Sequence, residues 1–75
     1  METNLRNLRD KNGLTQQKLC NNLAKTGYFL DRSTYAKYET GDRSMPVEFL
    51  VALSSYYGTS VDYILKLTKN ENKIM

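Results

Sequence analysis

The sequence contains no histidine and no tryptophan, and it has a single cysteine and a single proline. Histidine is a common zinc ligand and the usual general base beside a serine or cysteine nucleophile. Its absence excludes histidine-ligated zinc sites and Ser–His or Cys–His catalytic pairs. We therefore expect neither a metal site nor a cofactor.

Cys20 has no second cysteine to pair with, so the chain can form no intramolecular disulfide. A small domain without disulfides is typical of a reducing compartment. The amino terminus, Met-Glu-Thr-Asn, does not have the basic and apolar regions of a signal peptide. No apolar run approaches the roughly 18 residues that a transmembrane helix needs. These features predict a cytoplasmic protein that does not associate with a membrane.

The 75 residues, of which 40% are hydrophobic, can build one small core but not two. The net charge of +3 permits a nucleic-acid partner without requiring one. No segment alternates apolar and polar residues for long enough to indicate a strand. Helical periodicity and capping residues instead predict an all-α fold, with helices near residues 3–12, 15–26, 31–41 and 46–57 and a fifth beginning at Thr59 or Ser60.

Three details of these helices are predicted from local chemistry. Pro46 is expected at the first helical position of the fourth helix, where its missing N–H costs nothing. In the fifth helix, Ile64 and Leu67 are among the residues expected to face the core. At least two of the three apolar residues 28–30 are expected to pack beneath the connection that precedes the third helix.

The stretch from residue 31 to residue 41 predicts a short helix with a functional outer face. Asp31 is a suitable N-cap, and Gly41 can end the helix with a positive φ. Tyr35 and Tyr38 fall on one side, three residues apart. The other side combines small residues with long cations and carries no carboxylate: Arg32, Ser33, Ala36 and Lys37. This composition indicates that the helix lies against a negatively charged partner.

Four segments in order carry a resemblance to a known family: LRNLRDKNGLTQ (5–16), RSTYAKYETG (32–41), PVEFLVAL (46–53) and GTSVDYIL (58–65). Together they resemble the phage-repressor type (Xre/Cro-like) of helix-turn-helix DNA-binding domain over roughly residues 4–68. The resemblance implies a lambda-repressor-like fold of five helices, in which helices 2 and 3 form the helix-turn-helix and the third enters the major groove. We expect this domain to occupy residues 1–68, and the polar composition of residues 69–75 predicts a tail.

The resemblance implies roles for ten residues. Those that match base-reading positions are Arg32, Ser33, Ala36 and Lys37, and those that match contacts to the DNA backbone are Gln16, Gln17, Thr34 and Arg43. Arginine suits the first role because it can hold guanine through O6 and N7. The last two, Arg9 and Glu39, match a structural salt bridge between the first and third helices.

Two features depart from the family pattern. The connection from Leu23 to Asp31 is about five residues longer than the usual tight turn, which bears on the tilt of the third helix. Tyr35 stands where an aliphatic residue is usual, so its hydroxyl is expected to find a hydrogen-bond partner or to reach the surface.

The function that follows is a sequence-specific regulator of transcription that binds double-stranded DNA. We expect a repressor acting as a homodimer on a palindromic operator, with Tyr56, Tyr63 and the tail from Leu67 to Met75 as candidates for the dimer surface. The alternative is a protein-binding regulator, such as an antitoxin, in which DNA binding is secondary. An enzyme is not expected because no nucleophile and base remain, and no small-molecule effector is predicted.

Overall fold

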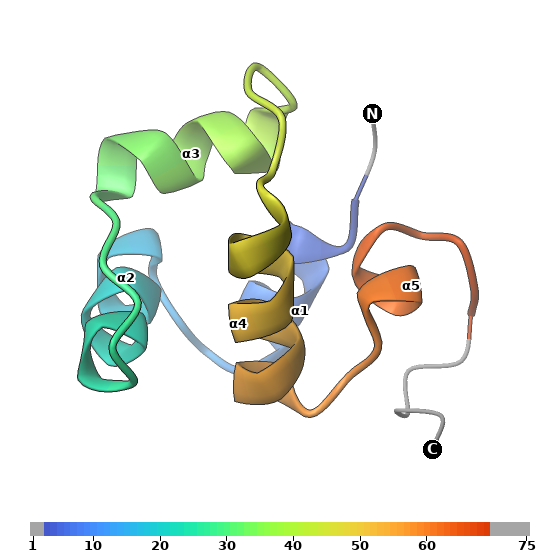
Figure 1. The fold of residues 1–75 in the computed structure, drawn as a ribbon, viewed down its shortest axis with the longest axis horizontal. Helices are drawn as coiled ribbons and strands as arrows, with labels where there is room; N and C mark the ends of the chain where they lie inside the picture. Colours follow the sequence, from blue (N-terminus) through green and yellow to red (C-terminus); the bar gives the residue numbers. More distant parts are fainter. Residues whose placement is uncertain (1–2, 70–75) are drawn as a thin grey trace.

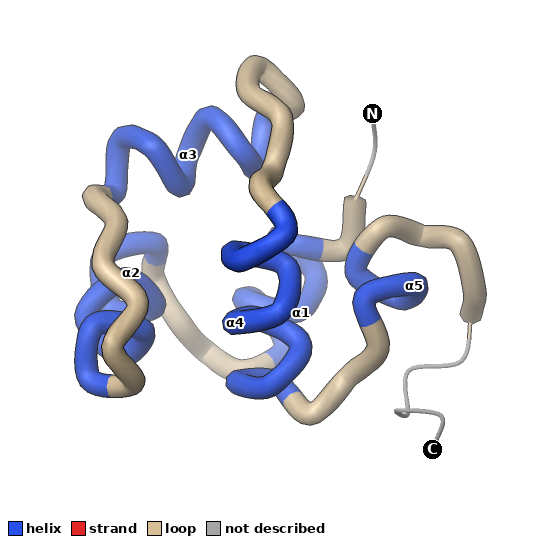
Figure 2. Tube along the Cα trace, in the orientation of Figure 1, coloured by secondary structure: helices blue, strands red, loops and turns tan. Residues whose placement is uncertain are grey.

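The computed structural model describes residues 3–69, which form five helices and no β-strand (Figures 1 and 2). The helices are α1 (Leu5–Lys11), α2 (Gln16–Lys25), α3 (Arg32–Thr40), α4 (Val47–Tyr57) and α5 (Val61–Ile64). The prediction of an all-α fold of five helices is therefore confirmed. No helix among these residues is long and apolar enough to cross a membrane.

Short-range hydrogen bonds account for where most helices begin. The side chain of Thr15 accepts from the backbone N–H of Lys18 at 3.1 Å, and this bond caps α2. Ser60 caps α5 in the same way, by accepting from the N–H of Tyr63 at 3.0 Å. Such caps satisfy backbone donors that the first helical turn leaves free, so these residues determine the helix starts locally.

Pro46 lies one position earlier than expected. Its ψ of 157° is extended, so the first residue of α4 is Val47 and Pro46 is the N-cap. Its carbonyl oxygen accepts from the N–H groups of Phe49 and Leu50 at 3.1 and 3.2 Å. Proline provides this carbonyl without needing a donor of its own, which explains why the residue is tolerated there.

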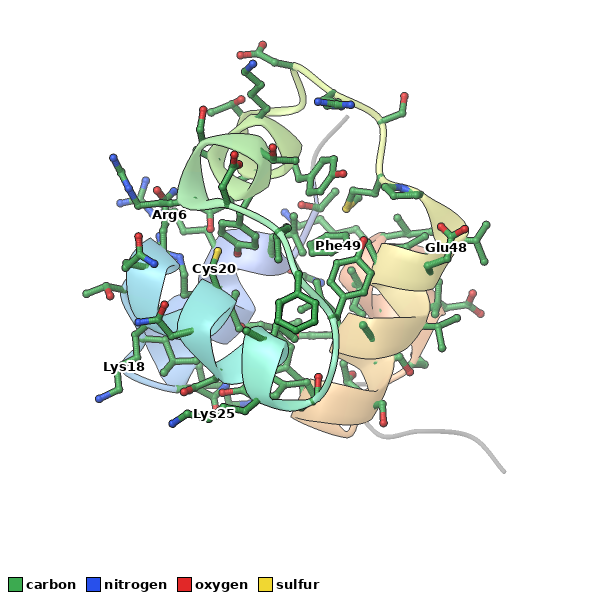
Figure 3. All side chains as sticks on the ribbon, turned by 60° about the vertical axis from the view of Figure 1, so that its left-hand side comes forward. Arg6, Lys18, Cys20, Lys25, Glu48 and Phe49 are labelled. Atoms are coloured by element: carbon green, nitrogen blue, oxygen red, sulfur yellow. The ribbon has the colours of Figure 1, made fainter. Side chains whose placement is uncertain are left out.

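The core is built around Phe49, which points inward from α4 (Figure 3). Its ring lies 4.6 Å from that of Tyr38, 6.0 Å from that of Tyr28 and 6.2 Å from that of Tyr35, measured between centroids. Aliphatic side chains from four helices complete the core: Leu5, Leu8, Leu19, Leu23, Leu53 and Ile64. The two inward tyrosines thus attach α3 to α4 by one face and leave its other face outward.

The two ends of the described chain are joined. The backbone N–H of Asn4 donates to the carbonyl of Ile64 at 2.9 Å, and the Asn4 side-chain amide donates to the carbonyl of Tyr63 at 2.7 Å. Asn4 is the N-cap of α1, but its side chain makes no capping bond. Its polar groups serve instead to hold α5 against the start of α1.

Two expectations about apolar residues have different outcomes. Tyr28 and Leu30 pack against the core while Phe29 is 79% exposed, so the prediction that two of the three pack is confirmed. The prediction for Leu67 is wrong, because this side chain is 67% exposed. Helix α5 ends at Ile64, and Lys66 takes a φ of +59° that turns the chain before Leu67 is reached.

Candidate nucleic-acid interface

Helix α3 is held at both ends by local chemistry. The Asp31 carboxylate accepts from the backbone N–H of Thr34 at 2.7 Å. Hydrogen bonds from the side chain and backbone of Thr34 lower the pKa of Asp31, so the carboxylate stays ionised next to the positive end of the helix dipole. At the other end, Gly41 has a φ of 84° and lets the chain leave the helix.

The outward face of α3 brings together all four residues predicted to read bases. Arg32, Ser33 and Lys37 are exposed, and Ala36 is half-buried between them. They line one shallow surface depression whose remaining members are Thr40 and Asp42. Thus the structure places the four side chains on a common surface.

The sequence interpretation overlooked one member of this depression, Asp42. Its carboxylate lies on the surface beside a face that was expected to be free of acidic groups. A signal was present in the sequence, because Asp42 directly follows Gly41, where the chain folds back at the end of α3. An acidic rim repels phosphate, and a carboxylate can also accept from the N4 amino group of cytosine.

The first turn of α2 carries the two glutamines that were predicted to contact the DNA backbone. The Gln16 side-chain amide donates to Oε1 of Glu39 at 3.3 Å, and Gln17 donates to Oδ1 of Asn21 at 2.9 Å. Each bond uses one of the two N–H groups of the amide, so each glutamine keeps a second donor. Gln16 is half-buried and Gln17 is exposed.

The two other residues predicted to contact the backbone lie at opposite ends of α3. Thr34 is half-buried in the first turn, next to the carboxylate of Asp31. Arg43 is exposed in the loop after α3 and borders a concave region formed with Met45 and Leu50. The predicted backbone contacts therefore surround the outward face of α3 instead of lying within it.

An ion pair between α1 and α3 lies beneath this surface. The Nε of Arg9 donates to Oε2 of Glu39 at 2.8 Å and its Nη2 donates to Oε1 at 3.2 Å, while the two side chains are 12% and 9% exposed. The third nitrogen, Nη1, donates to the carbonyl of Leu14 at 2.9 Å. Burial alone would raise the pKa of Glu39, but the bonds from Arg9 and its neighbours lower it below the ordinary value.

Tyr35 is completely buried, so its hydroxyl does not reach the surface, and the polar group that interacts with it is the Glu39 carboxylate. Within the described chain this oxygen has no partner in hydrogen-bond geometry, and the same is true of Tyr57. Burial, together with the neighbouring Glu39 carboxylate, raises the pKa of Tyr35, so the hydroxyl stays protonated. The ring replaces the usual aliphatic residue as packing against Phe49, and the hydroxyl is carried into the core with it.

The residues suggested for a dimer surface differ in their availability. Tyr56 is half-buried, and its hydroxyl accepts from the side-chain amide of Asn22 at 2.9 Å. Tyr63 is half-buried, whereas Leu67 is largely exposed. Residues 70–75 of the predicted tail lie outside the described residues.

Three other large apolar side chains are exposed, and the sequence interpretation gave none of them a functional role. Phe29 lies in the connection between α2 and α3, and Val47 and Val51 lie on α4 with exposures of 73% and 57%. The two valines stand four residues apart, on the side of the helix away from Phe49. Their spacing was a signal in the sequence, since it defines a second apolar stripe on α4.

Comparison with known proteins agrees with this geometry. The family model described as helix-turn-helix matches residues 5–64. The chain is 38% identical over 64 residues to YobD of Bacillus subtilis strain 168, with 85% of this chain and 53% of the relative covered. It is 35% identical over 68 residues to YqaE of the same strain, with 91% of this chain and 54% of the relative covered. Both relatives are named as uncharacterized HTH-type transcriptional regulators.

This chain spans about half the length of these two relatives. No solved structure matches it.

Proposed function

This chain belongs to the helix-turn-helix family, and we propose that it is a sequence-specific regulator of transcription that binds double-stranded DNA. In this proposal it acts as a repressor, as a homodimer on a palindromic operator, with α3 in the major groove. The names of the two relatives support a role in transcription. No catalytic step is part of the proposal.

The observation that carries the proposal is the division of α3 into two faces. Tyr35 and Tyr38 are buried, while Arg32, Ser33 and Lys37 on the opposite side are exposed. A cationic face on a capped helix of nine residues suits the major groove, which admits an α-helix and displays acceptors on guanine. Buried tyrosines and helix caps hold this face without using any of the outward side chains.

The shape of the molecule supports a dimer of the proposed kind. Two recognition helices that read adjacent turns of DNA lie about 34 Å apart, so each lies about 17 Å from the two-fold axis. The longest dimension of the protein is 29 Å, and along it α3 begins near one end while α5 lies near the other (Figure 1). A two-fold axis beside α5 would therefore give a spacing of this order.

Selection of bound sequences from a random duplex pool at a fixed salt concentration tests the proposal directly. We expect an enriched palindromic motif whose half-sites are one helical turn apart. Sedimentation of the protein with a single copy of that motif should give two protein chains per duplex. Recovery of no motif would overturn the proposal, and a motif without a repeat would overturn its dimeric part.

One observation favours a second candidate function, the protein-binding regulator. Val47 and Val51 give α4 an exposed apolar stripe, and α4 carries only one charged residue, Glu48. A surface of this type is more apolar than the outward face of α3 and suits a protein partner better than DNA. Under this candidate, replacing both valines with serine abolishes regulation while leaving DNA binding intact.

A further inference from the structure

The connection between α2 and α3 exposes a large aromatic side chain. Phe29 is 79% exposed, although its neighbours Tyr28 and Leu30 both pack against the core. A phenylalanine in this state contributes little to folding, because most of its apolar area remains in water. The same ring gains free energy when a partner covers it.

Phe29 lies between the two groups of proposed DNA contacts. It lines one shallow hollow together with Gln17 and Asn21 on the outer side of α2 and with Asp31, the N-cap of α3. Gln17 is a proposed backbone contact, and the first proposed base-reading residue, Arg32, directly follows Asp31. The connection that carries Phe29 runs up to the start of α3 at the front of Figure 3. In the sequence and in space, the ring is next to the end of α3 that leads into the groove.

The proposed reading surface provides hydrogen-bonding groups but little apolar area. Arg32, Ser33 and Lys37 are polar, and Ala36 offers one half-buried methyl group. In the major groove thymine is the base that presents a methyl group, at C5, and phenylalanine is one of the side chains that contact it. We propose that Phe29 is a specificity-determining residue that recognises the 5-methyl group of one thymine in each half-site.

This inference rests on the proposed function, since it requires that α3 enters the major groove. It adds a base contact from outside α3, and it gives the long connection a role in reading DNA. The connection contains six residues, from 26 to 31, between the end of α2 and the start of α3. Its length gives Phe29 room to lie over α2 while Leu30 packs inward.

The experiment uses the selected duplex and replaces each thymine in turn with uracil, which differs only by the loss of the 5-methyl group. Affinities of the unaltered protein, Phe29→Ala and Val47→Ala are measured for every duplex at one salt concentration. Val47→Ala is the matched control, because it removes an apolar side chain of similar exposure, 73%, from α4. Melting temperatures of both variants should stay close to that of the unaltered protein, since both side chains are exposed.

We expect the unaltered protein to lose about fourfold in affinity when uracil replaces one particular thymine in either half-site, the value for losing the burial of one methyl-sized group. Val47→Ala should show the same loss, whereas Phe29→Ala should bind the thymine and uracil duplexes equally well.

Three outcomes overturn the inference. If a methyl-dependent thymine is found and Phe29→Ala keeps the full dependence, the methyl group is read by another residue. If the selected motif binds with no methyl dependence at any thymine, Phe29 reads none, and the proposed function remains valid. If no motif is selected at all, the proposed function fails first and the role of Phe29 fails with it.

Discussion

Replacement of Glu39 by alanine should destabilise the whole domain. The Glu39 carboxylate accepts from Nε and Nη2 of Arg9 at 2.8 and 3.2 Å, and from the amide of Gln16 at 3.3 Å. These bonds join α1, α2 and α3 beneath the proposed DNA surface. The alanine variant removes the acceptor of all three and leaves the nearly buried Arg9 guanidinium with only the more distant and more exposed carboxylate of Asp10, at 3.8 Å, as a counter-charge.

The size of the effect follows from the burial of the pair. The side chains of Arg9 and Glu39 are 12% and 9% exposed, and removing one partner of a buried pair costs about 3–5 kcal/mol. Arg9 keeps its bond to the carbonyl of Leu14, so we expect the lower end, about 3 kcal/mol. A domain of this size has a total stability of about 4–11 kcal/mol. Each kcal/mol shifts the melting temperature by about 4–8 °C, so a drop of at least about 12 °C is expected.

Thermal and urea unfolding followed by far-ultraviolet circular dichroism measure this change. Glu48→Ala is the matched control, because it makes the same substitution at an exposed carboxylate on α4 and should change stability by less than about 0.5 kcal/mol. Adding Arg9→Met to Glu39→Ala should recover part of the lost stability, since it removes a nearly buried charge that has lost its main partner. The reasoning is refuted if Glu39→Ala and Glu48→Ala unfold at the same temperature.

Four further predictions follow. Because the pKa of Glu39 lies below its ordinary 4.5, its contribution to stability is present above that pH and is lost as the pH falls through the folded-state value. The stability difference between the unaltered protein and Glu39→Gln, measured by urea unfolding, should therefore shrink in acid. Thr15→Ala should lower the free energy of unfolding by about 1 kcal/mol in thermal unfolding, because it removes the cap of α2. Thr15→Ser, which still offers a capping hydroxyl, should retain most of that stability. Phe49→Ala should cost about 3–5 kcal/mol in the same assay, and often unfold the domain, because Phe49 is fully buried among three tyrosines. In binding titrations, Arg32→Ala should lose about 1–3 kcal/mol of binding free energy and relax the base preference at one position of the site. Arg43→Ala should weaken binding to all DNA sequences alike, and it should lower the slope of log affinity against log salt concentration by about one.

The helix ends were predicted well from the sequence, because they depend on local chemistry. Asp31 and Gly41 were assigned as the two ends of α3, and the structure finds them in these positions. Such assignments succeed because a cap and the turn it stabilises are separated by three residues or fewer. Pro46 was misplaced by one position, which is the usual precision of a helix end.

Other features depend on residues that are distant in the sequence. The bond between Gln16 and Glu39 spans 23 residues, and the one between Asn22 and Tyr56 spans 34. No periodicity relates such residues, so the sequence alone did not indicate that the Gln16 amide would be partly engaged. Likewise, the sequence places Asp42 directly after Gly41, but only the fold shows that it borders the same depression as Arg32 and Lys37.

The sequence by itself determined the five helices, the inward tyrosines and the cationic outer face of α3, because helical periodicity and caps act over a few neighbouring residues. Only the tertiary structure decided which polar groups form internal hydrogen bonds and which apolar side chains remain exposed to solvent. It buried the hydroxyl of Tyr35 and left the ring of Phe29 exposed. These outcomes depend on how the six-residue connection and the helices pack against one another, and packing is a property of the whole chain.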